Sequence, residues 1–333
     1  MVRWRGRRES DNVEDRRGES GSGGFPFPMG RGGRVRFPFP GRGGGGGRRG
    51  GIGIVGLLVI LGLMLFFGVD PRVILQGGQQ PGSSPDIQMP DIRLPGGTKP
   101  SSSPQTGGGR QVQAPKSKND DALKRYVTVI LADTEDIWNR LFKQMGRQYR
   151  EPTLVIFSGA TRSGCGVGMA AMGPFYCPLD QKLYIDLDFY KEMKNRFGAS
   201  GDFAQAYVIA HEVGHHVQTL LGISEKVQRA KSRMSQKQGN ALQVRMELQA
   251  DCLAGVWANL ANRSKNILEP GDVEEGLNAA SAIGDDNIQR RTQGHIVPDA
   301  FTHGTSKQRV RWFKRGLDSG DIQQCDTFNA RSL

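Results

Sequence analysis

The sequence predicts an α+β protein, in which a mostly helical domain with a small sheet follows one N-terminal transmembrane helix. Three observations support this prediction. Residues 51–69 form an unbroken apolar run. Residues 153–157 and 182–186 have the composition of short strands. Helical periodicity dominates the chain after Phe203, so the foldable domain is expected at residues 119–333.

The first fifty residues are too polar to form a core of their own. They contain 15 Gly and 12 Arg without any Lys. With five acids their net charge is +7, which is more than half of the chain's net charge of +12. Too little apolar surface is present to offset the entropy of ordering, so residues 1–50 are expected to be a disordered Arg/Gly-rich tail. The remaining chain is only mildly basic, which excludes a globally basic nucleic-acid-binding protein.

The apolar run GIGIVGLLVILGLMLFFGV covers residues 51–69 and contains no charged side chain. At about 1.5 Å per residue it comes close to the roughly 30 Å hydrocarbon thickness, so one spanning helix is predicted. A buried core helix and a cleaved signal peptide are the alternatives. Fifty preceding residues and the lack of a small-x-small cleavage site before Asp70 disfavour a signal peptide.

The arginines set the expected orientation. Twelve precede the run and include Arg42, Arg48 and Arg49, whereas Arg72 is the only basic residue soon after it. The positive-inside rule places the N-terminus in the cytoplasm and the domain in the periplasm or outside the cell. A single pass through the cytoplasmic membrane would make lipid a partner of residues 51–69. RNA binding by the tail is the alternative, but arginines that approach the run favour a role in topology, and nucleic acid is not an expected partner.

Residues 70–118 are rich in Pro, Gly, Ser and Gln, which is typical of a flexible linker. A helix is expected to begin near Asn119, where apolar residues start to recur at helical spacing. A strand at residues 153–157, a Gly-rich segment and a second strand at residues 182–186 follow. The sequence thus predicts that the sheet precedes the helical part of the domain.

One helix carries the pattern of a metal site. The run AQAYVIAHEVGHHVQ contains His211, Glu212 and His215. Two histidines four residues apart lie on one helix face, so both imidazoles can bind one Zn²⁺ ion. Glu212 lies beside the metal and can take a proton from zinc-activated water. A pair of solvated or core histidines is the alternative, and His216 is predicted to pack rather than to bind metal.

A zinc site needs a third protein ligand, which the helical run RMELQADCLAGVWANL offers. Glu247 and Asp251 are four residues apart and share a face. Glu247 can therefore bind the metal while Asp251 accepts a hydrogen bond from a zinc histidine. Acids on helices are usually solvated, but the apolar neighbours of this pair indicate a buried helix. A buried carboxylate needs a metal or a hydrogen-bond donor.

The segments HEVGHHVQ and ELQADCLAGVWA resemble the bacterial neutral zinc metallopeptidase family of membrane-anchored proteins with an exported C-terminal domain. The resemblance covers residues 120–330, and none of it falls in the first fifty. H-E-x-x-H followed by E-x-x-x-D is also the gluzincin arrangement. The resemblance implies a zincin-like metallopeptidase domain with one zinc per chain. It assigns His211, His215 and Glu247 as metal ligands. It also assigns Glu212 as the general base and Asp251 as the acid that orients a zinc histidine.

Two further features follow from the gluzincin resemblance. A His or Tyr after the glutamate helix commonly stabilises the oxyanion, and His303 is the candidate because it precedes a helix capped by Thr305 or Ser306. A locally packed histidine is the alternative, and His295 is a weaker candidate. The strand at residues 182–186 is expected at the sheet edge that lines the cleft, where an extended peptide could add.

The four cysteines fit an oxidising compartment. Cys165 and Cys177 bracket a Gly-rich loop that a disulfide would close, and Cys252 would then pair with Cys325. The other pairings remain open from sequence alone. No C-x-x-C spacing supports the cysteines as zinc ligands.

These observations predict a membrane-anchored zinc metallopeptidase that hydrolyses proteins or peptides outside the cytoplasm. Zinc-activated water would attack the peptide bond, with Glu212 as general base. The alternative is a catalytically silent, membrane-anchored interaction module with a structural zinc site. Glu212 argues against this alternative, because a structural site needs no base beside an open position.

Overall fold

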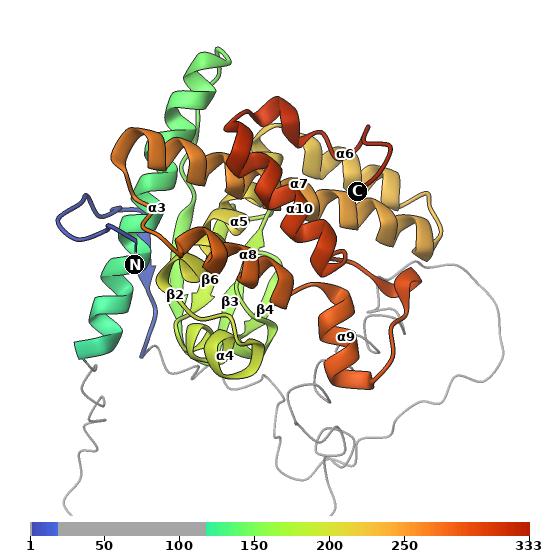
Figure 1. The fold of residues 1–333 in the computed structure, drawn as a ribbon, viewed down its shortest axis with the longest axis horizontal. Helices are drawn as coiled ribbons and strands as arrows, with labels where there is room; N and C mark the ends of the chain where they lie inside the picture. Colours follow the sequence, from blue (N-terminus) through green and yellow to red (C-terminus); the bar gives the residue numbers. More distant parts are fainter. Residues whose placement is uncertain (1, 19–117) are drawn as a thin grey trace, which may run out of the picture. The chain divides into compact units, whose positions relative to one another are not determined.

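A computed structural model describes residues 2–18 and 118–333 of the chain (Figure 1). The predicted transmembrane helix at residues 51–69 lies outside the described residues, as do residues 19–50 and the linker at residues 70–117. Within the described part, no helix has both the length and the apolar character needed to cross a membrane. The described fold is mostly helical with a small sheet, which confirms the predicted α+β class.

The main sheet has four strands in the order β1-β2-β6-β5, and only β5 runs antiparallel to its neighbour. Its strands are β1 (Val13–Asp15), β2 (Thr153–Phe157), β5 (Phe175–Cys177) and β6 (Lys182–Asp186). The two predicted strands, β2 and β6, are confirmed. The expectation that β6 forms the sheet edge is wrong, because β2 and β5 flank it. The covering strand β5 has three residues in the Gly-rich segment, too few to show an alternating pattern.

Helices form most of the domain. They wrap the sheet region and include a long first helix, α3, and the crossing pair α7 and α10 (Figure 1). The helices are α3 (Lys118–Gln144), α4 (Asp188–Phe197), α5 (Asp202–Leu220), α6 (Ile223–Lys231), α7 (Gln236–Lys265), α8 (Asp272–Ala282), α9 (Asp285–Gln293) and α10 (Ser306–Ser319). The remaining elements are the hairpin strands β3 (Ala160–Ser163) and β4 (Gly166–Met169) and the short 3-10 turns η1 (Ala170–Met172), η2 (Pro298–Ala300) and η3 (Ile322–Cys325).

Alternate residues of β2 face two different cores, because side chains alternate along a strand. Leu154 and Ile156 belong to the main core, which α3, α5 and α7 share. Val155 and Phe157 belong to a smaller cluster with Tyr184. The sheet is therefore buried on both faces, and α5 is fixed through the core against one of them.

Two glycines bring α7 and α10 into close contact. A Cβ atom at Gly316 would lie 1.9 Å from the backbone oxygen of Cys252, and one at Gly255 would lie 2.1 Å from that of Phe313. No larger side chain fits at either position without separating the helices. This contact holds α10 against the helix that carries Glu247.

Both predicted disulfides are confirmed. Cys165 and Cys177 are joined at an S–S distance of 2.05 Å, and Cys252 and Cys325 at 2.02 Å. The first closes the β3–β4 hairpin segment onto β5. The second ties η3 to the middle of α7.

The prediction that residues 1–50 are disordered is wrong for residues 2–18, which form an ordered arm on the domain. Strand β1 pairs with β2 over Val13–Asp15, and Val2 is buried in the main core. Figure 1 shows this segment in blue beside α3. Its composition would leave the segment disordered in isolation, but hydrogen bonds and ion pairs to the domain order it.

Candidate metal centre

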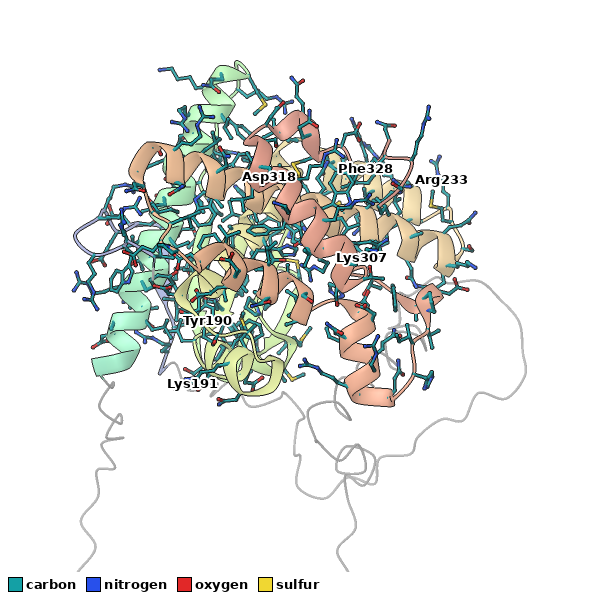
Figure 2. All side chains as sticks on the ribbon, viewed as in Figure 1. Tyr190, Lys191, Arg233, Lys307, Asp318 and Phe328 are labelled. Carbon is teal, nitrogen blue, oxygen red and sulfur yellow. A yellow bond between two sulfur atoms is a disulfide. The ribbon has the colours of Figure 1, made fainter. Side chains whose placement is uncertain are left out.

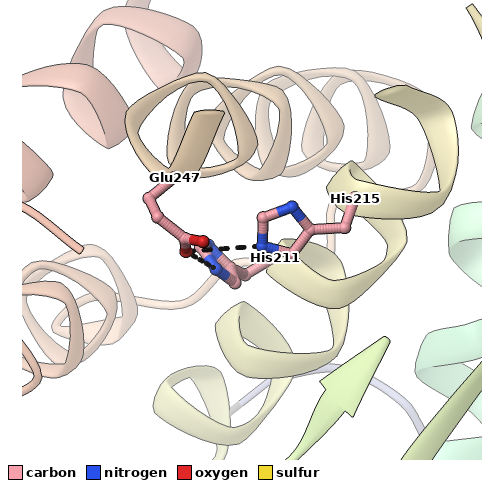
Figure 3. Close-up of side chains that lie close together, drawn as sticks. All are labelled: His211, His215 and Glu247. Atoms are coloured by element: carbon pink, nitrogen blue, oxygen red, sulfur yellow. Dashed lines mark ion pairs between the residues drawn. The ribbon is translucent and has the colours of Figure 1, made fainter. Parts of the chain in front are cut away.

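His211 and His215 on α5 converge with Glu247 on α7 (Figure 3). The Nε2 atoms of the two histidines lie 3.3 and 3.4 Å from the same oxygen, Glu247 Oε2. The three donor atoms all lie within 4.8 Å of one another. All three side chains are largely buried, so the structure brings together the three residues that the sequence proposed as ligands.

A glycine in the histidine motif allows this convergence. A Cβ atom at Gly214 would lie 3.0 Å from the backbone oxygen of Ala250 on α7 and 3.1 Å from its Cα atom. Such a contact is tighter than most real Cβ contacts, so a side chain here would push α7 away. Gly214 thus lets the glutamate of α7 reach the histidines of α5.

Gln218 fixes the orientation of His215. Its amide nitrogen donates to the backbone oxygen of Met246 at 2.7 Å and lies 3.1 Å from Oε1 of Gln249. The amide oxygen therefore faces His215 Nδ1, 2.9 Å away, and this nitrogen must be the N–H donor. The Nε2 atom of neutral His215 then presents its lone pair to the site.

Asp251 fixes the orientation of His211. Its Oδ1 atom lies 2.8 Å from His211 Nδ1, which is the contact that the sequence suggested. Burial would raise the pKa of Asp251, but Arg309 and His211 lower it to about 2. Asp251 is therefore a carboxylate that accepts the Nδ1–H of His211. The lone pair of Nε2 points toward Glu247.

Arg309 and Tyr207 hold Asp251 in place, and sequence reasoning missed both residues. Arg309 donates to both carboxylate oxygens of Asp251, from Nε at 2.9 Å and from Nη2 at 2.8 Å. The Tyr207 hydroxyl donates to Asp251 Oδ1 at 2.5 Å. Arg309 is 2% exposed, and it comes from α10, far from α7 in the sequence.

The electrostatics of the cluster favour a bound cation. Burial would lower the pKa of His211, yet Asp251 and Glu247 raise it to about 9. Burial would raise the pKa of Glu247, yet His215 and His211 lower it well below its ordinary value. Each group therefore favours positive charge at the point where the three donor atoms meet.

The donor set and its spacing fit zinc. Two histidines and one carboxylate are a ligand set of catalytic zinc sites, which leave one position for water or substrate. With bonds of about 2.0–2.1 Å, tetrahedral ligand atoms lie about 3.3 Å apart. The distances of 3.3 and 3.4 Å from the histidine nitrogens to Glu247 Oε2 match that spacing.

Glu212 follows His211 on α5 and is half-buried. Burial raises the pKa of its carboxyl group above the ordinary value, although the charges of His211 and His215 oppose the shift. A carboxylate with a raised pKa is a better proton acceptor than an ordinary one. Its position and its chemistry suit a general base.

His303 lies in the loop before α10, which begins after an N-cap at Thr305. Asp285 holds this loop, because its Oδ2 atom accepts backbone N–H groups from Thr302, His303 and Gly304 at 2.6–3.0 Å. The imidazole Nδ1 of His303 lies 3.1 Å from Asp285 Oδ1. Desolvation of the ring opposes its charged form, but Asp285 and the charge of Glu247 raise the pKa of His303, whose side chain is half exposed. His303 is not one of the three converging donors.

The two remaining histidines lie apart from the cluster. His216 is fully buried, where Nε2 lies 2.6 Å from the Arg150 backbone oxygen and Nδ1 lies 3.1 Å from the Tyr176 hydroxyl. Burial lowers its pKa to about 4, so it packs as a neutral residue, as predicted. His295 is exposed and lies near the Gln293 backbone oxygen.

Comparison with known proteins gives a family and two groups of relatives. A family model described as "Putative neutral zinc metallopeptidase" matches residues 2–328. "Uncharacterized protein YpfJ" of Escherichia coli (strain K12) is 47% identical over 329 residues, covering 98% of this chain and 99% of the relative. "Uncharacterized protein Rv2575" of Mycobacterium tuberculosis (strain ATCC 25618 / H37Rv) is 40% identical over 280 residues, covering 81% and 86%. No solved structure matches the chain. The family match begins in the arm, so the view that the first fifty residues carry none of the resemblance is wrong.

Proposed function

The chain belongs to the neutral zinc metallopeptidase family, and from this premise we propose that it is a zinc-dependent peptidase. His211, His215 and Glu247 would hold the metal. The substrates would be proteins or peptides, since the reaction of such a site is hydrolysis of a peptide bond.

One observation carries this proposal. His211 Nε2 and His215 Nε2 both lie at zinc-ligand spacing from one carboxylate oxygen of Glu247, and all three atoms lie within 4.8 Å of one another. Asp251 and Gln218 accept from Nδ1 of the two rings, so Nε2 of each ring is the nitrogen left to bind a metal. A positive charge at the point where these atoms meet stabilises the cluster, and this charge can be a proton on His211 or a metal ion that replaces it.

The residues around the donors support a hydrolytic reaction. A zinc ion held there would polarise the scissile carbonyl and lower the pKa of a water molecule. Glu212 would take a proton from the attacking water and deliver it to the leaving amine, which returns Glu212 to its carboxylate form. His303, held by Asp285, would donate a hydrogen bond to the oxyanion that develops on the attacked carbonyl.

We place the reaction outside the cytoplasm. The two disulfides support an oxidising compartment, because cytosolic proteins rarely keep such bonds. The apolar run at residues 51–69 remains the candidate for attachment to membrane lipid.

Metal content tests the proposed function. Purified full-length protein should contain about one zinc per chain and should cleave an unfolded protein substrate. A chelator should stop cleavage and added zinc should restore it. Glu247→Ala should lose the metal, whereas Glu274→Ala, which changes an exposed glutamate on α8, should keep it.

Folded wild-type protein without metal, or cleavage that resists chelation, would contradict the proposal. Bound zinc without cleavage would favour the interaction module.

His303→Ala should lower turnover by about 10²–10³-fold, because one oxyanion donor contributes about 2.7–4 kcal/mol to the transition state. Zinc content should not change, since His303 is not among the converging donors. His295→Ala is the matched control, because His295 is exposed and bonds only locally within the described residues. Measured kcat of the two variants checks this. Equal kcat values for the two variants would show that His303 only stabilises the loop.

A further inference from the structure

The arm, residues 2–18, is held to the domain at several separate places. In backbone contacts, Leu154 donates to Asn12 at 2.8 Å and Arg16 donates to Ile156 at 2.7 Å. At the start of the arm, the Val2 N–H donates to the Asp202 carboxylate at 2.8 Å. The arm thus contacts β2 and the start of α5, and without it β2 would be an exposed edge strand.

Two buried acids on α3 have partners in the arm, and one of them, Glu135, depends on it. Glu135 is 0% exposed, and the polar partners found for its carboxylate in the described ranges are Ser10, Asn12 and Arg8, all in the arm. Asp133, also buried, accepts from Arg7 of the arm and from Lys265 of α7, both at 2.6 Å. A buried carboxylate without a partner is strongly unfavourable, so this face of α3 is built to receive the arm.

Most arginines of the arm are engaged in ion pairs, although the positive-inside rule would count them as indicators of membrane topology. Five of the arm's arginines have acidic partners in the fold, and only Arg5, which lies over the Trp4 ring, is described without one. Arg3, Arg7 and Arg8 pair with acids of the domain, whereas Arg16 and Arg17 pair with Glu14 and Asp15 of the arm itself. The positive-inside rule applies to free charges near a membrane, whereas these arginines are paired in the fold.

A chain that crosses a membrane once leaves its two ends on opposite sides. We infer that the arm and residues 118–333 lie on the same side of the membrane, so that docking of the arm excludes a single pass by residues 51–69. A run of this length can cross only once. The disulfides then place the arm in the oxidising compartment together with the domain. This inference does not depend on the peptidase activity.

Labelling of single cysteines in whole cells tests the inference. All four native cysteines are in disulfides, so an introduced cysteine is the only free thiol. Asp11→Cys places it at an exposed position of the arm. Lys307→Cys places it at an exposed position of α10 (Figure 2). The full chain is treated with a membrane-impermeant maleimide before and after permeabilisation.

Equal labelling of both positions in intact cells is the expected result. Labelling of both only after permeabilisation would support the shared side but contradict an exported domain. Labelling of Lys307→Cys in intact cells, with Asp11→Cys protected until permeabilisation, would overturn the inference and restore the single-pass topology.

Thermal unfolding of the purified full chain tests the docking itself. Arg8→Asp places a negative charge beside Glu135 and Asp136 and should lower the melting temperature by several degrees. Arg5→Asp is the matched control, because Arg5 is exposed on the same arm, and it should leave the melting temperature unchanged. The same melting temperature for both variants would overturn docking in solution.

Discussion

Glu212→Gln is expected to lower peptidase turnover by about 10²–10⁴-fold, the usual contribution of a general base. Glutamine keeps the size and shape of the side chain but cannot take a proton from the attacking water. Zinc content should remain at the wild-type level, because Glu212 is not among the donors that converge on the site. Turnover of an unfolded protein and metal content are measured on the same preparation.

The control for this variant is Glu225→Gln on α6. Glu225 is exposed and paired with Arg229, so its loss should leave turnover unchanged. Full activity of Glu212→Gln would remove the general base from the proposed mechanism. Loss of zinc together with activity would instead show that Glu212 supports the fold of the site.

The candidate metal centre was the most predictable part of this molecule, because the sequence pattern that indicates it is local. His211 and His215 share a face of one helix, as do Glu247 and Asp251, and helical spacing fixes those relations without knowledge of the rest of the fold. That the two helices meet could not be derived from spacing. It depends on Gly214, which lets α7 approach α5.

The residues that support the centre come from distant parts of the chain, and their roles could not be derived from local patterns. Gln218 and Arg309 act through partners on other helices. One signal for Arg309 was nevertheless present. Arg309, Trp312, Phe313 and Gly316 form the buried stripe of α10, and an arginine on such a stripe indicates a buried partner.

The arm was mispredicted for a related reason. Its composition is that of a segment that cannot fold alone, and this conclusion is correct for an isolated chain. Its polar side chains match acids that α3 buries, such as Glu135, and complementarity of this kind is visible only when both partners are placed. Strand β5 escaped detection because three residues carry no usable periodicity.

Arg309→Met is expected to weaken both zinc binding and folding. Asp251 would keep its charge in a fully buried position without its main partner, which costs about 3–5 kcal/mol when one member of a buried pair is removed. The orientation of His211 depends on Asp251, so zinc affinity should fall about 10–100-fold. Denaturant unfolding of the metal-free protein and a zinc titration measure the two effects separately.

Two further variants separate positioning from folding. Arg309→Lys keeps the charge but loses the bidentate contact with Asp251. It should therefore recover part of the stability and part of the zinc affinity that Arg309→Met loses. Arg311→Met, on the exposed side of the same helix, is the matched control and should change neither quantity.

Removing the charge of Asp251 as well gives the decisive comparison. In Asp251→Asn with Arg309→Met no buried charge is left unpaired, so stability should return toward the wild type. Zinc affinity should stay low, because an amide is a weaker acceptor for the Nδ1–H of His211 than a carboxylate. Recovery of both quantities would show that Arg309 only neutralises a buried acid. Recovery of stability alone would establish that Arg309, through Asp251, positions a zinc ligand.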